Sequence, residues 1–462
     1  MKKALLVVLV IVQLLIFCIP SMAISTDPSD YENYYPQFVD SKLPLSTLSE
    51  RDIATWTYKP LSALLDKNMI GWYNVPYGTD PAQKLDIYNS TNTKKQPVIF
   101  YIHGGGWATG DKDDVGALAI AGKEWLSKGY MVVSINYRLG VISKDDPTAA
   151  KRIPSQPVVD TIDPATRNAY PTQIEDCDRA LKWVIDNISK YGGDPDNIAI
   201  TGISAGGHLA ALLTVDNIRL KSFGIDRSKI KCSIPVAGIY DCTLPENYSQ
   251  EWMPAFMKAM LDIPEKAIDA SPVVHVTGNE PPMLIVHGSD DWLVPRTNAY
   301  EMFDVLKEKG SKTAELEILR GYNHGTTLTR YNEPGDDAAK VINRFLAVYL
   351  PSDGNHVDGK KLDVDIRLND STVDFDDAQP YIQNGIIMVP ETFITKNISA
   401  WMQLDSPGIY KVTLGNVSVK VDDSMLAKKD KTTFVPLRFV CEGLGAKVEW
   451  LPNTQTAVVD FN

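Results

Sequence analysis

The sequence predicts an α/β protein: a mostly parallel sheet with helices on both faces, followed by a small C-terminal α+β domain. Between residues 72 and 350, short apolar runs such as "PVIFYI" and "MVVSIN" alternate with amphipathic runs such as "TQIEDCDRALKWVIDN". Continuous apolar strands between helices are typical of a parallel sheet that is buried on both faces. After residue 361 the runs become short and β-rich, with "FVPLRFVCEGLG" as the clear helix candidate. This change of rhythm predicts a second domain.

The first residues are typical of a secretory signal rather than of a folded domain. Lys2 and Lys3 precede an apolar run over residues 4–19, and small residues stand before a cleavage position after Ala23. A membrane anchor is one alternative, although the run is short for a membrane span. Lipidation at Cys18 is a minor second alternative. We therefore expect a signal peptide over residues 1–23 and a secreted or cell-surface protein.

Three segments are expected in the mature chain. An α/β domain covers residues 24–350 and contains an insertion at about 242–280. A polar stretch with glycines and a proline, residues 351–361, is typical of a linker. The β-rich domain covers residues 362–462.

Charge and cysteine content argue against several classes of protein. Without residues 1–23 the chain has 44 basic and 58 acidic side chains, which gives a formal charge of −14. An acidic chain without a basic stripe is not expected to bind nucleic acid or an anionic membrane. The chain holds no C-x-x-C pair, so a zinc knuckle is not expected either. We expect mostly free, buried thiols at Cys177, Cys232, Cys242 and Cys441.

The stretch "GISAGG" predicts a sharp turn that exposes a serine nucleophile. It follows the strand-like run "NIAIT" and precedes the helix-like run "HLAALLTV", so Ser204 stands between a strand and a helix. Side chains at Gly202 and Gly206 are expected to clash with neighbouring backbone in such a turn. The N–H group of Ala205, at the start of the helix, is placed to donate to an oxyanion. A plain glycine-rich turn is the alternative, and the rest of the chain decides between the two.

A second glycine-rich stretch fits the catalytic interpretation. The run His103-Gly104-Gly105-Gly106-Trp107 follows the strand "PVIFYI". Bare N–H groups after a strand are suited to the other half of an oxyanion hole, and we assign that role to Gly105 and Gly106.

A carboxylate that orients the catalytic base is expected in "VHGSDDWLVP". Asp290 and Asp291 both qualify. The spacing favours Asp291, the first residue after the turn, and Asp290 is the alternative.

The general base is predicted to be His324 in "GYNHGT". Of the six histidines, only His324 stands at a strand end on the C-terminal side of the acid. The chain order is then Ser204, Asp291, His324, the serine–acid–histidine order of one hydrolase fold.

Five motifs carry a resemblance to a known family: "HGGGWATGDK", "VVSINYRL", "YGGDPDNIAITGISAGGHLAALL", "VHGSDDWLVP" and "GYNHGT". Residues 72–350 resemble an α/β-hydrolase, close to the secreted bacterial carboxylesterases that include feruloyl and acetyl esterases of plant cell-wall polysaccharides. The resemblance implies a cofactor-free serine carboxylesterase that acts on short-chain or aromatic acyl esters, either small molecules or polysaccharide-linked. Two departures point away from neighbouring subfamilies. No Ala-Pro-Glu follows Tyr-Arg-Leu as in hormone-sensitive-lipase relatives, and Ile203 replaces the glutamate of type-B carboxylesterases.

The C-terminal residues resemble the copper amine oxidase N-terminal-like (stalk) domain of secreted Gram-positive proteins. The match is fairly specific in "TTFVPLRFVCEGLGAKVEWLPNTQTAVVDF" and looser in "LNDSTVDFDDAQPYIQNGIIMVP". No histidine cluster is present in this stretch, so no copper is expected. The resemblance implies a role in attachment to the cell surface or in spacing.

The insertion at about 242–280 is a candidate cap over the pocket. It carries Trp252 and Met257 among other large apolar residues, and we assign these two and Trp107 to substrate binding. Packing of the insertion's own small core is an equally weighted alternative.

The expected reaction is ester hydrolysis through an acyl-enzyme. His324 takes the proton of Ser204, Asp291 orients the imidazole, and the glycine loop and Ala205 bind the oxyanion. A prolyl-type serine peptidase is less favoured, because such enzymes usually carry a β-propeller before the hydrolase domain. A non-catalytic surface-binding protein that retains the fold is disfavoured by the complete set of catalytic residues.

Overall fold

A computed structural model gives the fold of two compact units, which divide between residues 356 and 357. The predicted signal peptide, residue Trp252 and most of the predicted linker lie outside the described residues. The structure describes residues 61, 69–90, 95–113, 117–151, 156, 158–161, 168–249, 253–261, 263–331, 336–353, 364–369, 371–375, 378–383, 386–451 and 456–461.

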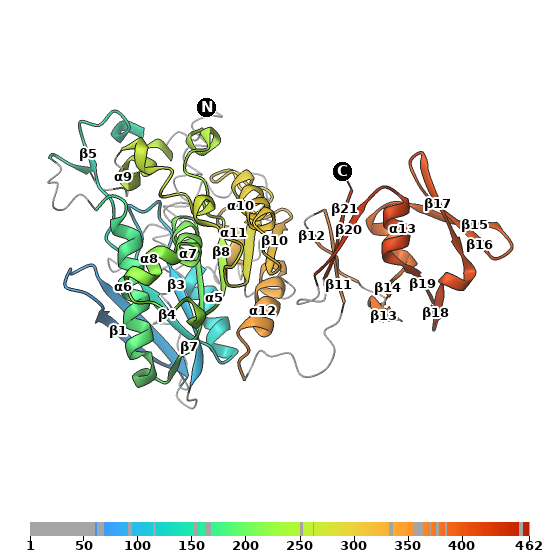
Figure 1. Cartoon of the computed structure of the whole chain (residues 1–462), viewed down its shortest axis with the longest axis horizontal. Coiled ribbons are helices and arrows are strands. Elements are labelled where there is room, and N and C mark those ends of the chain that lie inside the picture. Colours follow the sequence, from blue (N-terminus) through green and yellow to red (C-terminus); the bar gives the residue numbers. More distant parts are fainter. Residues whose placement is uncertain are drawn as a thin grey trace, which may run out of the picture. The chain divides into compact units, whose positions relative to one another are not determined.

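The first unit is built on an eight-stranded sheet (Figure 1). Across the sheet the strands are β1 (Met69–Pro76), β2 (Lys84–Ser90), β4 (Met131–Ile135), β3 (Gln96–Ile102), β7 (Gly193–Ile203), β8 (Ile230–Val236), β9 (Met283–Gly288) and β10 (Ala314–Leu319). β2 is antiparallel to both β1 and β4, and every pair from β4 to β10 is parallel. The prediction of a mostly parallel sheet is therefore confirmed.

Helices cover both faces of this sheet. On one face lie α5 (Ala117–Ser127) and α12 (Asp337–Tyr349), and on the other α6 (Thr172–Asn187) and α7 (Ala205–Val215). The remaining helices of the unit are α8 (Asn217–Ser222), α9 (Met253–Leu261), α10 (Thr297–Glu308) and α11 (Thr326–Thr329). A short parallel pair, β5 (Ile142–Ser143) and β6 (Val158–Val159), stands apart from the main sheet.

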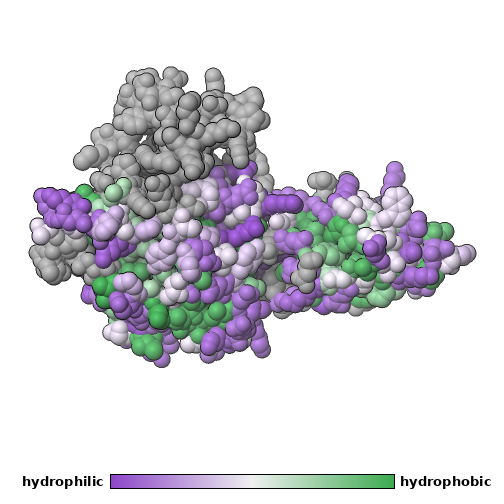
Figure 2. Space-filling model, turned by 90° about the horizontal axis from the view of Figure 1, so that it is seen from above, coloured by the Kyte–Doolittle hydropathy of each residue, from purple (hydrophilic) through white to green (hydrophobic). Residues whose placement is uncertain are grey.

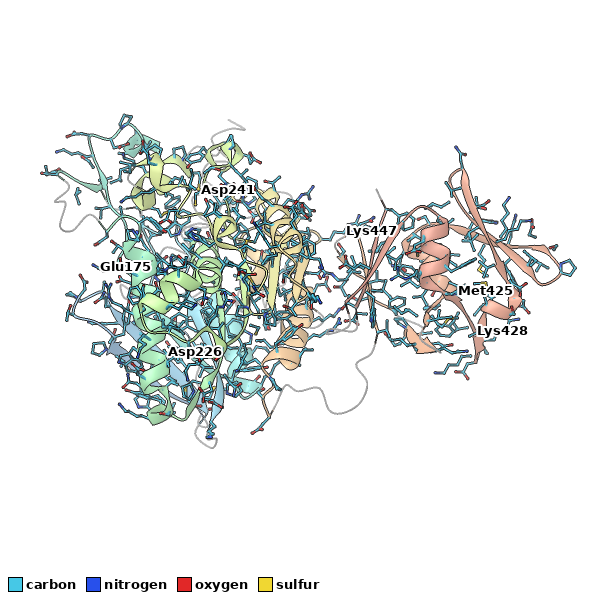
Figure 3. The ribbon with its side chains drawn as sticks, viewed as in Figure 1. Glu175, Asp226, Asp241, Met425, Lys428 and Lys447 are labelled. Atoms are coloured by element: carbon cyan, nitrogen blue, oxygen red, sulfur yellow. The ribbon has the colours of Figure 1, made fainter. Side chains whose placement is uncertain are left out.

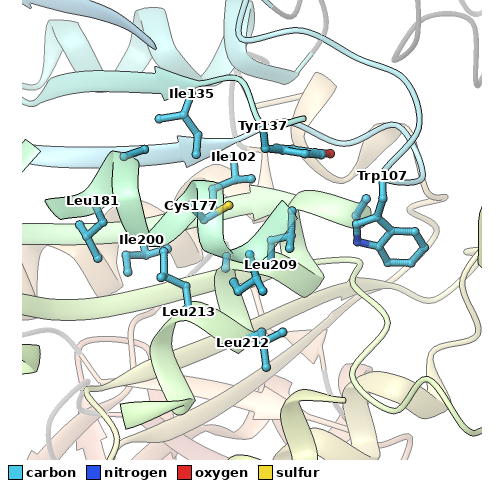
Figure 4. Close-up of a cluster of buried hydrophobic side chains, with 14 of the residues drawn as sticks. Ile102, Trp107, Ile135, Tyr137, Cys177, Leu181, Ile200, Leu209, Leu212 and Leu213 are labelled. Carbon is cyan, nitrogen blue, oxygen red and sulfur yellow. The ribbon is translucent and has the colours of Figure 1, made fainter. Parts of the chain in front are cut away.

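Strand β3 shows how the apolar runs fill both layers. Phe100 and Ile102 point into the cluster that holds α6 and α7, whereas Ile99 and Tyr101 point into the cluster that holds α5 and α12. Successive strand side chains face opposite sides, so a strand between two helical layers needs an apolar residue at nearly every position. Figure 4 shows one of these layers, with Ile102 among the labelled residues. Full burial of each such side chain contributes about 1.5–3 kcal/mol.

The insertion after β8 leaves the sheet at a polar turn. Asp241, labelled in Figure 3, accepts hydrogen bonds from the N–H group and the Oγ1 hydroxyl of Thr243, at 2.7 and 2.6 Å. From there the chain runs through short turns and α9, whose Phe256 and Met257 are buried against the rest of the unit. The insertion therefore shares the main core.

The cysteines and the helices carry two further findings. Cys177, Cys232, Cys242 and Cys441 are free and buried, which confirms the expectation of free, buried thiols. Among the described residues, none of the helices is sufficiently long and apolar for a bilayer crossing.

The second unit is β-rich and has its own core, which confirms the prediction of a second, β-rich fold. Val389, Val435 and Val440 are among its buried residues. Apolar residues also reach the surface of this unit (Figure 2), and Trp401 is 67% exposed. The unit contains α13 (Leu437–Gly443), within the predicted helix. Its strands are β11 (Asp365–Leu368), β12 (Ser371–Thr372), β13 (Tyr381–Gln383), β14 (Ile386–Pro390), β15 (Trp401–Ser406), β16 (Ile409–Leu414), β17 (Val417–Asp422), β18 (Ala427–Lys429), β19 (Thr432–Pro436), β20 (Lys447–Leu451) and β21 (Thr456–Asp460).

Candidate active site

Parallel strands bring the predicted catalytic residues to one edge of the sheet. The register pairs Ile102 of β3 with Gly202 of β7, so the glycine loop and the serine turn leave the sheet side by side. β9 and β10 end together, because Gly288 pairs with Leu319. The carboxyl ends of parallel strands are where open α/β sheets place ligand sites. The four loops therefore surround a common site.

Ser204 occupies a strained turn between β7 and α7. Its φ and ψ are 58° and −122°, a backbone conformation that non-glycine residues rarely adopt. A Cβ atom on Gly206 would lie 2.0 Å from the carbonyl oxygen of Ile102, and one on Gly202 would lie 2.6 Å from the same oxygen. The expectation that side chains at these two glycines would clash with backbone is confirmed. The turn presents a half-buried Ser204 at the sheet edge.

The glycine loop passes directly beside this turn. A Cβ atom on Gly104 would lie 3.4 Å from the Cβ atom of Ser204. Gly105, Gly106 and Trp107 all have positive φ, at 107°, 58° and 59°. Positive φ at three successive residues makes the loop turn sharply beside the serine. Ala205 opens α7, and the N–H groups of the first turn of a helix have no partner within it.

Asp291 and His324 are hydrogen-bonded to each other. The Nδ1 atom of His324 lies 2.8 Å from Oδ2 of Asp291, so this ring nitrogen donates and the other, Nε2, is left with the proton-accepting role. The other carboxylate oxygen of Asp291 accepts the N–H groups of Leu293 and Val294, both at 2.9 Å. The structure brings His324 together with Asp291 and not with Asp290, whose carboxylate accepts from Ser289.

A second histidine, His287, contacts the same carboxylate. Its Nε2 atom lies 3.2 Å from Oδ2 of Asp291, and both side chains are fully buried. Burial alone would raise the pKa of Asp291. The charge of a protonated His324 and the hydrogen bonds of both histidines nevertheless hold that pKa well below its ordinary value. Asp291 is therefore ionised at neutral pH. The sequence offers one local signal of this contact, the i, i+4 spacing of His287 and Asp291, which by itself does not predict it.

Ser204 opens into a pocket with about 300 Å³ of empty space, its open mouth included. Apart from Ser204 the side chains that line it are apolar. The lining residues are Gly106, Trp107, Ser204, Ala205, Ile239, Met253, Phe256, Leu293 and Val294.

The insertion contributes to this pocket through residues other than those predicted. Met257 is buried in the core and is not among the lining residues, whereas Met253 and Phe256 of the same helix line the pocket. Positions 253, 256 and 257 lie on the same face of the helix, because residues three and four apart are neighbours there. The sequence spacing therefore could not show which of them line the pocket and which pack in the core. Trp107 does line the pocket, as predicted, and Trp252 lies outside the described residues.

No group of three or more potential metal-binding side chains comes together within the described part of the chain.

Comparisons with known proteins agree with this architecture. Residues 85–151 and 163–306 match the BD-FAE family model. Over these residues the first unit is similar to the BD-FAE family. Residues 413–462 match the copper amine oxidase N-terminal domain, so the resemblance to that domain is confirmed over these residues.

Curated relatives of the first unit include esterases. A protein of Mycobacterium tuberculosis named "Probable carboxylic ester hydrolase LipM" is 34% identical over 278 residues, which cover 58% of each chain. "Esterase LipQ" of the same organism is 29% identical over 286 residues, or 59% of each chain. Alignments with these relatives thus span about three fifths of their length. Among solved structures, a "Truncated form of carbohydrate esterase from gut microbiota" has a TM-score of 0.48 at 23% identity, over 62% of this chain and 98% of the other.

Proposed function

We propose that the protein is a serine carboxylesterase that cleaves esters of short, uncharged acyl groups. One observation carries the proposal: Ser204, in its strained turn beside the glycine loop, opens into an apolar pocket at the sheet edge where His324 and Asp291 are paired. The curated relatives named as ester hydrolases support it.

In the proposed reaction His324 removes the proton of Ser204, and Oγ attacks the ester carbonyl carbon. The N–H groups of Ala205 and of Gly105 or Gly106 stabilise the oxyanion, each by about 3 kcal/mol. The intermediate expels the alcohol, which takes the proton from His324. Water then attacks the acyl-enzyme with His324 again as the base, and the carboxylic acid and free Ser204 result.

The acyl preference follows from the lining of the pocket. Apolar side chains such as Ile239 and Phe256 offer no partner to a charged or strongly polar acyl group, whose desolvation would then go uncompensated. Uncharged apolar acyl groups are therefore the expected substrates, short-chain or aromatic as the sequence resemblance implies, and acetyl is the smallest of them. We propose a sugar of a polysaccharide as the alcohol, as the sequence resemblance implies, with export directed by residues 1–23 and attachment by the second unit.

Hydrolysis of p-nitrophenyl acetate by the purified protein tests the proposal. We expect turnover with an initial burst of p-nitrophenol, because deacylation follows a faster acylation. A chain that fails on p-nitrophenyl acetate, propionate and butyrate alike, yet is folded by circular dichroism, would refute the esterase assignment. Hydrolysis of proline p-nitroanilides in place of esters would point to the peptidase alternative.

Replacement of Phe256 by alanine is expected to widen the acyl pocket. Its ring packs on Gly106, where a Cβ atom would lie 2.2 Å from the Cδ1 atom of the ring. Removal of the ring leaves room for added methylene groups, so the ratio of kcat/KM for hexanoate to that for acetate should rise about 10-fold or more. Met257→Ala is the matched control: it also removes a buried side chain of α9 but does not line the pocket, so its acyl-length profile should follow that of the wild type. Equal acyl-length profiles for Phe256→Ala and Met257→Ala would contradict the assignment of Phe256 to the acyl pocket.

A further inference from the structure

His208 connects the nucleophile turn, the glycine loop and the insertion through one buried ring. It lies on α7, and its backbone N–H group donates to the carbonyl oxygen of Ser204 at 3.0 Å. Its Nδ1 atom lies 3.1 Å from the indole Nε1 atom of Trp107, and its Nε2 atom lies 2.8 Å from the carbonyl oxygen of Ala270. The side chain is fully buried, and the indole meets the imidazole edge to face at 5.2 Å.

The partners of the ring define its protonation state. An indole N–H group can only donate, so Nδ1 of His208 must accept from Trp107. The proton therefore resides on Nε2, where it is donated to Ala270. A protonated imidazole would direct a second N–H group at the indole N–H group. Burial, with a smaller contribution from the charge of Arg219, lowers the pKa of His208 to about 4. The thiol of Cys242, whose Sγ atom lies 3.9 Å from Nε2 of His208, is a titratable group in contact with the ring.

Trp107 needs such an anchor because its backbone is strained. With φ at 59° it adopts a left-handed conformation that costs a residue with a Cβ atom about 1 kcal/mol or more. The loop before it carries Gly105 and Gly106, which also have positive φ. Two contacts hold Trp107 in place: the N–H group of Gly140 donates to its carbonyl oxygen at 2.8 Å, and its indole donates to His208. The second contact joins the loop directly to the helix that begins after Ser204.

We propose that His208 is a positioning residue that fixes the oxyanion loop relative to the nucleophile by accepting the indole N–H group of Trp107. This inference rests on the proposed esterase function for its kinetic consequences. Since Ser204 and His208 are one turn apart on the same helix end, any movement of Trp107 away from His208 would also move the N–H groups of Gly105 and Gly106 away from the oxyanion. The contact thus acts on the transition state rather than on substrate binding.

Two amide variants separate the two hydrogen bonds of the ring. Asparagine places its amide oxygen where Nδ1 stands, so His208→Asn keeps an acceptor for Trp107 and loses the donor to Ala270. Glutamine places its amide where Nε2 stands, so His208→Gln keeps the donor to Ala270 and loses the acceptor for Trp107. We expect His208→Gln to lower kcat by about 10- to 100-fold with KM within about threefold, whereas His208→Asn should stay within about threefold of the wild type.

Trp107→Phe provides the second arm of the experiment. It keeps a ring in the pocket but removes the N–H donor, so kcat should fall as in His208→Gln, and the double variant Trp107→Phe/His208→Gln should be no worse than either single variant. Equal kcat values for His208→Asn and His208→Gln would overturn the proposal, and so would additive losses in the double variant. Melting temperatures of all variants, measured alongside, distinguish unfolding from a loss of kcat.

A measurement without substrate keeps the inference separate from the esterase assignment. With ¹⁵N-tryptophan labelling, the indole N–H resonance that disappears in Trp107→Phe identifies Trp107. It should be protected from hydrogen exchange in the wild type and in His208→Asn, and unprotected in His208→Gln. If the wild type hydrolyses no ester but shows this pattern, the proposed function fails and the anchor stands. An unprotected resonance in the wild type overturns the anchor whatever the activity.

Discussion

Ser204→Ala is expected to lower kcat for p-nitrophenyl acetate by about 10⁵- to 10⁶-fold, to the level of hydrolysis assisted by the oxyanion donors alone. The hydroxyl of Ser204 is the only side-chain nucleophile among the residues that line the described pocket. Without it no acyl-enzyme forms, so the burst of p-nitrophenol should vanish together with steady-state turnover. Binding should persist, since the apolar lining is unchanged, and equilibrium dialysis with a non-hydrolysable acetamide analogue checks this point.

The chain offers a matched control for this variant in Ser289, directly after β9. Its hydroxyl donates to Asp290 at 2.8 Å and accepts the N–H group of Gly321 at 2.8 Å, which identifies a role in a surface turn. Ser289→Ala should therefore keep kcat within about twofold of the wild type. Substantial turnover by Ser204→Ala, or a loss of similar size in both variants, would show that Ser204 is not the nucleophile.

Asp291→Asn is expected to lower kcat by about 10⁴-fold at neutral pH. The carboxylate accepts the Nδ1–H group of His324 at 2.8 Å, and an amide in its place can present an N–H group to that nitrogen instead. The imidazole would then favour the tautomer with its proton on Nε2, which cannot accept the proton of Ser204. KM should change much less than kcat. Steady-state kinetics between pH 6 and 9 measure both constants.

Asp290→Asn is the control that separates the two neighbouring carboxylates. Asp290 is exposed and hydrogen-bonded to Ser289. The kcat of Asp290→Asn should therefore remain within about twofold of the wild type. If Asp290→Asn caused the larger loss, the roles of the two residues would have to be exchanged. The charge of a protonated His324 and the hydrogen bonds of His287 and His324 to Asp291 also predict a stability effect. Since its folded pKa is depressed, its contribution is present above the ordinary carboxyl pKa and declines as the pH falls below about 4.

The features determined by the sequence itself are local ones. The apolar runs that became β3 and β7 predicted the sheet, because alternate side chains of a strand face opposite sides and both sides had to be apolar. Gly202 and Gly206 predicted the serine turn, since the close approach of Ile102 leaves no space for a Cβ atom. These inferences depend on the stereochemistry of a few neighbouring residues, which a sequence displays directly.

Only the tertiary structure decided which side chains meet. Asp290 and Asp291 are adjacent in sequence, and the turn after β9 places just one of them against His324. Packing of α9 likewise brought Phe256 rather than Met257 to the pocket. A contact between residues far apart in the chain depends on the packing of whole elements, where a shift of one position turns a side chain from the site into the core.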